Sequence, residues 1–440
     1  MFSERAIVIG GGYSVLVTAR VLADFFAEVV VLEKDAPQDS DQARKGVPQG
    51  RHVHGLQGHA LDLLNHYYPG IETDLIRAGA VSLDFGERIR LYLSHGWVPP
   101  GPAGRHGLSM TRPLLESVIR THTQRRSNIR LAWHQRVSGL NFEQGALSGV
   151  SHQTAAANRL DPGKPSGASA ATSLSAALVI DASGRGTRTA QWLAREGFSA
   201  PAISAIEVDV RYATALYERP PGPESEIGYV VRHYPMHKLG AALLPVEDNQ
   251  WLLSLSGRFG VYPGKDADAF MASAAQLPIA DIYETLQHAP ATTGVSAYTF
   301  SRNEIRHYPA DTPVGLVPVG DSVIALNPLY GQGMTSAVVQ ADLLSQSLRE
   351  INGARFDPGQ LSQRHLPKIA HFSAPPWKRA VLGDTLFKEA KGDIPADLSL
   401  WRAQEQQLNQ LAAKNAEVAR LIAQVAQFAE PPEKLEALLV

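Results

Sequence analysis

The N-terminal stretch has the pattern of a βαβ unit that binds a dinucleotide. A short apolar run precedes Gly10-Gly11-Gly12, and an apolar stripe at helical spacing follows over residues 15–26. A second apolar run then ends at Glu33. An acidic side chain about 20 residues after the glycines is where a dinucleotide fold hydrogen-bonds a ribose hydroxyl. The spacing therefore predicts an α/β fold that begins with a parallel sheet.

This glycine motif departs from its usual form at Val15, three residues after Gly12. The third glycine of the pattern normally lets the helix pack closely on the strand beside the pyrophosphate. Because valine adds an isopropyl group at that crossing, we expect the helix to be pushed outward or the ligand to be cramped. Two interpretations remain open: an adapted site that keeps its cofactor, or weakened and even lost binding.

A second informative segment lies between residues 314 and 344. A buried apolar run ends in Gly320-Asp321, an Asn-Pro turn follows, and a Gly-Gln-Gly step opens a helix of small and apolar residues. Backbone N–H groups and the positive helix end at residues 331–335 would stabilise negative charge on a reduced flavin. The alternative is an ordinary strand, turn and helix.

A third segment repeats the theme of a strand that ends in an acid and glycines. The apolar run 177–180 closes on Asp181, and Gly184 follows shortly after. Such an ending suits the floor of a cofactor cleft, although a plain turn has the same sequence pattern. The preceding stretch, residues 153–176, is rich in Ala, Ser, Gly and Pro without periodicity, and predicts an exposed loop between two strands.

Length, charge and composition restrict the class of protein. The chain has 440 residues, so one large domain with insertions, or two domains, is expected. A net charge of −2 gives no basic footprint for nucleic acid. There are no cysteines, which removes disulfides, thiolate nucleophiles and cysteine metal sites, and no metal site is predicted. No apolar run is long enough to cross a bilayer, so a cytoplasmic protein is expected.

Two further regions supply candidates for a pocket. The polar, basic segment at residues 44–54 could fold back over a cofactor, with Arg44 or Arg51 reaching a phosphate or ribose and His52 or His54 lining the pocket. A solvated loop with incidental histidines is the alternative. From about residue 206 to 301 the pattern predicts a mixed sheet. One face of it would be a substrate wall, and the wall candidates, which could equally be core residues, are Tyr212, His233 and Tyr234.

The remaining expectations concern local structure. A helix is expected from Thr111-Arg112-Pro113 to His122, and a strand at residues 130–137. The chain from Trp377 onward is expected to be helical. Its apolar stripe at helical spacing should pack on the protein's own core rather than on a partner. The stripe consists of Leu408, Leu411, Val418, Leu421, Ile422, Val425 and Phe428.

The three segments together resemble a known family. Residues 10–35 (GGGYSVLVTARVLADFFAEVVVLEKD), 178–189 (LVIDASGRGTRT) and 315–334 (GLVPVGDSVIALNPLYGQGM) are similar to the three motifs of group A flavoprotein monooxygenases, which have the para-hydroxybenzoate hydroxylase fold. The segments RKGVPQGRHVHGL and TRPLLESVIR look closer to a bacterial branch that includes FAD-dependent epoxidases of polyether biosynthesis and related tailoring enzymes.

The resemblance implies a set of FAD contacts. The first glycines would meet the pyrophosphate, Glu33 the adenosine ribose and Val137 the adenine. Asp321 would bind the ribityl and phosphate end, and residues 328–334 would flank the isoalloxazine. The Asp-Ala-Ser-Gly of the middle segment is an altered form of the usual Asp-Gly. The residues assigned to the cofactor are Gly10, Gly12, Glu33, Lys34, Arg44, Arg112, Val137, Asp181, Gly320, Asp321, Pro328, Gly331, Gln332, Gly333 and Met334.

The resemblance also implies an architecture and a reaction. The fold would be a Rossmann-like FAD-binding domain of the glutathione reductase type at residues 1–200 and 302–365. A substrate-binding mixed sheet would be inserted at 201–301, and a helical region would cover 366–440. NAD(P)H would reduce FAD, and reduced flavin would take O₂ to a C4a-(hydro)peroxide that epoxidises or hydroxylates a hydrophobic natural-product intermediate. The protein would be a monomer or homodimer without membrane insertion.

Other activities stay open at this point. The same scaffold could be a non-redox cyclase with FAD structural or lost, which Val15 makes worth testing, or an isoprenoid-type flavin reductase. A flavin halogenase is disfavoured because no two of the six tryptophans have the Trp-x-Trp spacing of that family. No catalytic base can be named from the sequence.

Overall fold

A five-stranded parallel sheet forms the centre of the computed structural model, which describes residues 1–37, 48–94, 96–102, 104, 106–154, 170–351 and 355–439. The predicted βαβ unit is present, with α1 (Tyr13–Leu22) between the first two strands. The segments that carry the three motifs all contribute to this sheet, although they are far apart in sequence. Its strands, from edge to edge, are β18 (Leu316–Pro318), β12 (Leu178–Asp181), β1 (Phe2–Ile9), β2 (Phe26–Leu32) and β8 (Ile129–Ala132).

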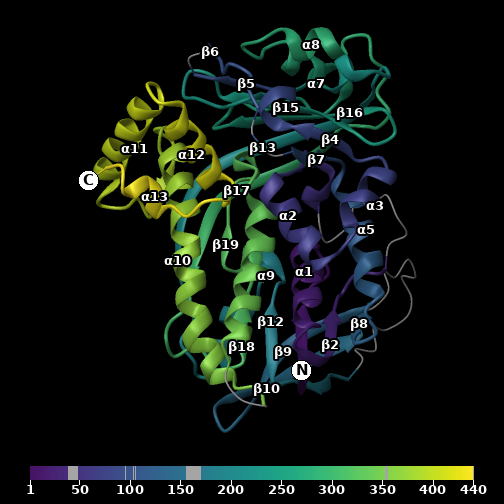
Figure 1. Cartoon of the computed structure of the whole chain (residues 1–440), viewed down its shortest axis with the longest axis vertical. Helices are drawn as coiled ribbons and strands as arrows, with labels where there is room; N and C mark the ends of the chain where they lie inside the picture. The colour runs from purple at the N-terminus through teal and green to yellow at the C-terminus, as the bar shows by residue number, and fades with distance from the viewer. Residues whose placement is uncertain are drawn as a thin grey trace.

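The central strands are buried on both faces, as expected for a parallel sheet whose strands are runs of Val, Ile and Leu. On one face Ala6 and Val8 pack with residues of α1 and α9 (Gly333–Arg349). On the other face Ile7 and Ile9 pack against a three-stranded antiparallel sheet. Figure 1 shows the helices in front of the sheet. The antiparallel sheet is formed by β9 (Gln135–Glu143), β10 (Ala146–Thr154) and β11 (Thr172–Ser175).

A large mixed sheet forms the second part of the molecule, and Figure 1 shows it across the upper part of the view. Its longest strand is β13 (Ala202–Glu218). This strand pairs with β17 over residues 202–214 and with β16 over residues 210–218. Strands from outside 201–301 also join it, so the large sheet extends beyond the predicted insertion. In order it contains β19 (Ile324–Ala325), β17 (Ser296–His307), β13, β16 (Gln250–Arg258), β15 (Leu239–Val246), β14 (Gly228–Val231), β5 (Ile89–Leu93) and β6 (Gly96–Trp97), while β20 (Lys391–Gly392) pairs with β13.

The two faces of the large sheet differ in chemistry because successive side chains point to opposite sides. Ala213, Ala215 and Leu253 face an apolar core that includes α7 (Ala267–Ala274) and α8 (Asp281–Leu286). The alternate residues Thr214 and Ser254 therefore face the parallel-sheet domain. A polar surface is thus directed toward the place where the cofactor motifs meet.

The remaining elements surround these sheets. A small sheet contains β3 (Gly55–Leu56), β7 (His106–Ser109) and β4 (Val81–Asp84). The other α-helices of the described residues are α2 (Gly58–Tyr67), α3 (Ile71–Arg77), α4 (Phe85–Arg88), α5 (Arg112–Gln124), α6 (Thr189–Arg195), α10 (Pro358–Asp384), α11 (Leu398–Ala412), α12 (Ala416–Ala426) and α13 (Glu433–Glu436). None of the described helices combines the length and the apolar character that a bilayer crossing demands.

Two local expectations need correction. The strand expected at residues 130–137 is divided between β8 and β9 by a turn at His134, which has a φ of +57°. The loop expected at 153–176 is shorter at both ends, because β10 continues to Thr154 and β11 pairs with it from Thr172. Residues 155–169 lie outside the described part of the chain. The helix expected at 111–122 is confirmed as α5, with the Thr111 side chain accepting a hydrogen bond from the Leu114 N–H at 3.4 Å.

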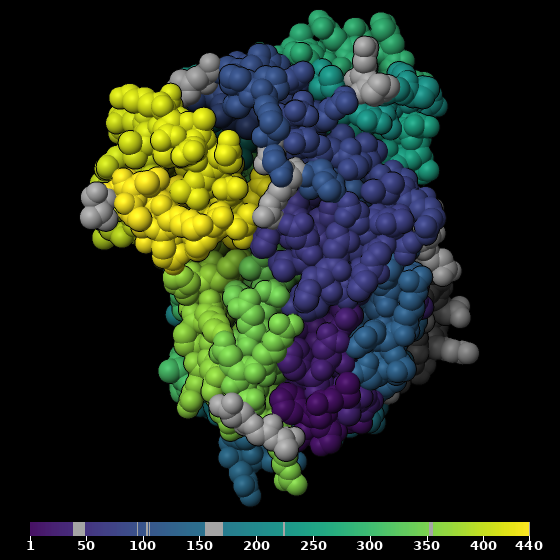
Figure 2. Space-filling model, in the orientation of Figure 1, coloured from purple at the N-terminus to yellow at the C-terminus, as the bar shows by residue number. Residues whose placement is uncertain are grey.

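The C-terminal helices form a lobe at one side of the molecule, yellow in Figure 2. The apolar stripe predicted there packs only in part on the protein's own core. Val418 and Val425 are buried, and Phe428 contacts Phe372 of α10 with ring centroids 5.1 Å apart. Leu411 remains 36% exposed.

Candidate cofactor and substrate site

The glycine loop between β1 and α1 has the geometry that its sequence predicts. Gly10 has a φ of +116° and donates its N–H to Leu32 O at 3.0 Å. A Cβ built on Gly11 would lie 2.7 Å from Glu33 Cγ, so a larger residue here would displace the Glu33 side chain. Glu33 is 6% exposed, and its carboxylate accepts a hydrogen bond from the Asp35 N–H at 2.8 Å. The acid thus lies directly beside the glycine loop, where a ribose would bind.

The Val15 side chain lies in the core rather than over the helix N-terminus. It is fully buried and packs in one cluster with Val8, Leu178 and Ala182. A Cβ built on Gly10 would lie 3.0 Å from Val15 Cγ2, so the valine fills the space between the loop and β12. The isopropyl group thus lies at the crossing of helix and strand, and its effect on a bound ligand stays a prediction.

The Gly320-Asp321 turn lies against the start of α1. A Cβ built on Gly320, whose φ is +72°, would meet Ser14 Oγ at 3.2 Å. The Gly320 N–H donates to Gln340 Oε1 of α9 at 2.7 Å. The third motif therefore contacts both α1 and α9.

Arg306 of β17 joins the second motif to the third. Its guanidinium donates to Asp321 O at 3.0 Å and to Arg185 O at 3.2 Å, and it also pairs with Glu304 at 2.6 Å. The Ser322 hydroxyl adds a second connection by donating to Asp181 O at 2.5 Å. All three motif segments thus meet at the C-terminal ends of β1, β12 and β18, which is where ligands bind in open α/β sheets.

The carboxylates of the second and third motifs differ in their surroundings. Asp181 is fully buried, and its side chain accepts hydrogen bonds from Ser183, Thr187 and Thr189 within its own turn. This acid shapes the turn. Asp321 is only partly buried by its neighbours, and no described residue donates a side-chain hydrogen bond to its carboxylate.

Three guanidinium groups act on the carboxyl group of Asp321. Burial raises the pKa of this carboxyl, while the guanidinium groups of Arg112, Arg185 and Arg306 act in the opposite direction. Three cations therefore surround the position at which the resemblance puts the ribityl and phosphate end of FAD. Such a cluster suits an anionic diphosphate.

Arg112 begins α5 beside the N-terminus of α1. Its Nε donates to Glu116 at 2.8 Å, and the same carboxylate accepts the Tyr13 N–H at 3.3 Å. His54 lies in this environment too, since burial, reinforced by Arg112, lowers the pKa of the imidazole to about 3. Its Nδ1 is 2.7 Å from His52 O.

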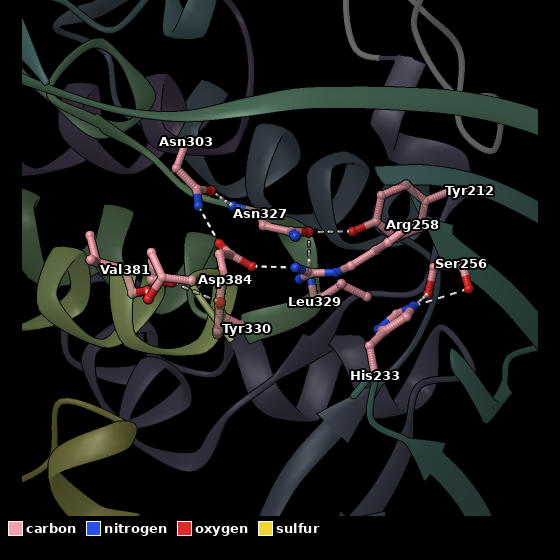
Figure 3. A network of polar contacts seen from close by, with 12 residues as sticks. Tyr212, His233, Ser256, Arg258, Asn303, Asn327, Leu329, Tyr330, Val381 and Asp384 are labelled. Carbon is pink, nitrogen blue, oxygen red and sulfur yellow. Dashed lines mark hydrogen bonds and ion pairs between the residues drawn. The ribbon is translucent and has the colours of Figure 1, made fainter. Parts of the chain in front are cut away.

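The loop at residues 327–331 is fixed by a buried polar network, shown in Figure 3. Asn327 accepts the Tyr212 hydroxyl at 2.6 Å through Oδ1, and its N–H donates to Asn303 Oδ1 at 2.6 Å. Asn303 in turn donates to Asp384 at 2.5 Å, which pairs with Arg258 at 2.5 Å. Arg258 and Asp384 are 4% and 0% exposed, so this ion pair is buried at the end of α10.

Space is available in front of the N-terminus of α9, where the isoalloxazine would lie. A Cβ built on Gly331 or on Gly333 would meet no described atom within 4 Å. The first turn of α9 has no side-chain cap, which leaves N–H groups at this helix end without an intrahelical partner. Gln332 donates to Ala426 O at 2.8 Å, and its buried Oε1 has no partner among the described residues. These features fit a flat ring that carries donors and acceptors, as a flavin does.

Residues of the large sheet, together with His52 from outside it, form a polar wall, which we define as His52, Tyr212, Thr214, Ser254 and Tyr298. His52 Nδ1 lies 2.6 Å from Thr214 Oγ1, which is 2.6 Å from Ser254 Oγ. The His52 ring packs against the rings of Tyr212 and Tyr298, with centroid distances of 5.7 and 5.4 Å, and the two tyrosine rings lie 6.1 Å from each other. Two residues predicted to contribute, His52 and Tyr212, are therefore brought together.

The other predicted wall residues lie further along the sheet. His233 Nε2 is 3.0 Å from Ser256 O, and burial, with a smaller contribution from Arg258, lowers the pKa of the imidazole to about 3. Tyr234 belongs to a tight turn, in which its N–H donates to His237 O at 3.0 Å.

The remaining predicted cofactor residues have varied positions. Arg44 lies outside the described residues, and Lys34 is exposed beside Glu33. Val137 lies in β9 with its side chain buried. Met334 is buried in the core between α1 and α2. Their contacts with FAD stay predictions.

The structure adds residues that the sequence patterns did not indicate. They are Arg306, Asn303, Arg258 and Asp384, which connect strands and helices far apart in the chain. Each belongs to a stretch without motif character, so only their buried, polar nature could have marked them.

An open groove of about 650 Å³ lies beside the second motif. Its lining is strongly charged, because it includes three carboxylates and two guanidinium groups. The residues are Arg185, Gly186, Glu207, Asp209, Ser301, Arg302 and Glu304. This groove does not fit a hydrophobic substrate.

Comparisons with known proteins define the fold. No family model matches the chain. Protein Rv3254 of Mycobacterium tuberculosis (strain ATCC 25618 / H37Rv) is 29% identical over 399 residues, which cover 89% of this chain and 82% of that protein.

Several solved structures share the fold at low sequence identity. The p-nitrophenol 4-monooxygenase PnpA from Pseudomonas putida DLL-E4 superposes with a TM-score of 0.66 at 15% identity, covering 97% of this chain and 98% of that chain. The flavin-dependent brominase Bmp2 gives 0.64 at 12% identity, with 99% and 98% covered. A 2-methyl-3-hydroxypyridine-5-carboxylic acid oxygenase gives 0.63 at 15% identity, with 87% and 90% covered.

Proposed function

We propose that this chain, which has the fold of the group A flavoprotein monooxygenases, is itself an FAD-dependent monooxygenase. It would use NAD(P)H and O₂ to introduce oxygen into a hydrophobic organic molecule by epoxidation or hydroxylation. A natural-product intermediate is the substrate class that the sequence resemblance favours. We further propose a cytoplasmic monomer or homodimer.

The observation that carries this proposal is the meeting of three motif segments at one sheet edge. Arg306 contacts both Arg185 O and Asp321 O, and Gly320 lies against Ser14 at the start of α1. Separate strand-turn structures would not require such mutual contacts. A shared ligand that spans all three segments explains why they converge.

The residues have distinct roles in this proposal. Glu33 would accept hydrogen bonds from the adenosine ribose, and the N-terminus of α1 with Arg112 would stabilise the diphosphate. The uncapped N-terminus of α9 would stabilise negative charge on the reduced ring. Bound FAD would supply the acceptance of hydride and the activation of O₂, which side chains alone cannot provide.

The space beside the polar wall would receive the substrate. Tyr212 and the 327–331 loop are hydrogen-bonded to each other. The wall would therefore have a fixed position relative to the isoalloxazine ring of FAD. Such a fixed geometry supports catalysis by proximity. The buried setting would also exclude water from the reacting centre.

Oxygen incorporation is the direct test. With its substrate present, purified holoenzyme should consume NAD(P)H faster than without it, and the product should contain one atom from ¹⁸O-labelled O₂. An isomeric product formed without O₂ would contradict the proposal and indicate a cyclase. A reduced product without labelled oxygen would indicate a reductase.

The likeness to a brominase suggests one more control. The reaction should be run with and without bromide, because halogenation would also consume NAD(P)H and O₂ on this scaffold. A halogenated product that forms only with bromide would assign the chain to halogenation instead.

A further inference from the structure

One buried nitrogen in the polar wall has no partner. His52 is 5% exposed, yet its Nε2 contacts no hydrogen-bonding atom in the part of the chain that the structure describes. The other polar atoms around it are engaged: the Tyr212 hydroxyl donates to Asn327 at 2.6 Å, and the Tyr298 hydroxyl accepts from Arg185 at 2.9 Å. An unpaired buried polar atom costs free energy, so its retention calls for a function.

The hydrogen count around His52 assigns its tautomer. Ser254 Oγ accepts the Val53 N–H at 3.0 Å and lies 2.6 Å from Thr214 Oγ1. Among the described residues these are the hydrogen-bond contacts of Ser254 Oγ, so its own proton can only be donated to Thr214. Thr214 must then donate to His52 Nδ1, which leaves the imidazole proton on Nε2.

The opposite tautomer is less favourable. If Nδ1 carried the proton, Thr214 would donate to Ser254, and the Ser254 hydroxyl proton would be buried without an acceptor in the described structure. Burial, with a smaller contribution from Arg51, lowers the pKa of His52 to about 4, so the ring is neutral near pH 7. His52 therefore presents one neutral N–H donor.

We propose that His52 is a specificity-determining residue whose Nε2–H donates a hydrogen bond to a carbonyl or hydroxyl oxygen of the substrate. The proposal rests on the proposed function and deepens it, since the substrate is then a ring-bearing apolar molecule with an oxygen acceptor rather than a pure hydrocarbon. The rings of Tyr212 and Tyr298, which pack against the imidazole and against each other, form an aromatic surface that suits a flat ring.

A second buried histidine shows why position matters. His365 of α10 is also fully buried, its Nδ1 lies 3.3 Å from Ser347 Oγ, and its Nε2 also has no described partner. This residue lies between α9 and α10, away from the polar wall. An unpartnered nitrogen alone is therefore not sufficient, and the polar, aromatic surroundings of His52 carry the inference. His365 also provides a matched control.

The test compares ligands that differ only in their oxygen. The dissociation constants of 1-tetralone, tetralin, 2-naphthol and naphthalene would be measured by equilibrium dialysis against the purified protein, with and without added FAD. Wild type should bind an oxygenated probe about tenfold more tightly than its hydrocarbon counterpart, the effect of one hydrogen bond from a buried donor. Binding is measured directly, so the result does not depend on turnover.

Substitutions separate the donor from the ring. His52→Phe retains a flat ring but should abolish the preference, whereas His52→Gln, whose amide can replace the Nε2–H, should retain part of it. Thr214→Val removes the hydroxyl that fixes the tautomer and should weaken the preference. His365→Gln should leave it unchanged.

Two results would overturn the inference. One is a wild-type protein that binds no oxygenated probe more tightly than its hydrocarbon counterpart, and the other is an undiminished preference in folded His52→Phe. Failure of the monooxygenase proposal would look different, because FAD binding or incorporation of labelled oxygen would then be lost while the His52-dependent preference persisted.

Discussion

At the scale of single residues, Val15 shows how position changes the meaning of a substitution. The sequence motif predicts a conflict at this site, because valine stands where glycine usually permits close packing. In the structure the side chain joins Val8, Leu178 and Ala182 in the core beneath the loop. The valine therefore contributes to the packing of the core.

Val15→Ala should consequently destabilise the protein without tightening FAD binding. Removing two buried methyl groups costs about 1.5–3 kcal/mol of unfolding free energy. Urea denaturation and FAD titration would measure the two effects. Val17→Ala is a matched control, since Val17 is equally buried on the same helix but packs in the neighbouring core cluster. Tighter FAD binding by Val15→Ala alone would show that the valine crowds the ligand.

At the scale of elements, the buried ion pair between Arg258 and Asp384 connects β16 to the end of α10. Through Asn303 it also fixes Asn327, the first residue of the 327–331 loop. Removing one partner leaves a buried charge without compensation. The pair should therefore govern both the stability of the protein and the position of the loop.

Asp384→Ala should lower the unfolding free energy by about 3–5 kcal/mol and weaken FAD binding as well. Glu350→Gln is the control, because it removes a carboxylate that pairs with Lys368 at 2.7 Å on the surface, where such pairs contribute about 0–1 kcal/mol. Equal unfolding midpoints for the two variants would refute the assigned role of the buried pair.

Elements with strong local signals could be predicted from the sequence. The βαβ unit and α5 follow from periodicity and from a Thr-x-Pro start, since these depend on neighbours in the chain. The break between β8 and β9 could not be predicted, because nothing in the sequence at His134 demands a positive φ. β5 and β6 join the large sheet by non-local pairing, which no local pattern encodes.

The site was predictable to a similar extent. The motif residues Gly320 and Glu33 lie at the ends of strands, as their patterns indicate, because each motif is a local strand-turn sequence. Arg306 and Asp384 were missed because their importance arises from contacts across the fold. His52 was identified as a candidate, but its hydrogen-bond partners became apparent only in the structure.

At the scale of the whole molecule, buried neutral histidines link stability to pH. Burial lowers the pKa to about 4 for His52 and His365 and to about 3 for His54 and His233, from an ordinary value of 6.5. Between the lowered pKa values and 6.5, the unfolded chain therefore binds more protons than the folded chain. By linkage, the free energy of unfolding rises with pH throughout this window.

The protein should thus lose stability as the pH falls from about 6.5 toward 4. Carboxylates with lowered pKa values, such as Asp357, contribute mainly below that range. Urea unfolding midpoints at several pH values would measure the slope, and His365→Gln should reduce it. A midpoint that stays constant between pH 7 and pH 4.5 would contradict the assignment of buried, uncharged histidines.

The central claim is that three distant segments form one binding site for FAD, and isothermal titration of the purified chain with FAD tests it most directly. We predict saturable binding of one FAD per chain, weakened at least about tenfold by Asp321→Ala, which removes an acceptor for the cofactor. Asp311→Ala, a change at an exposed residue, should leave the affinity unchanged. A folded protein that binds no FAD, or that binds it equally well after Asp321→Ala, would contradict the claim.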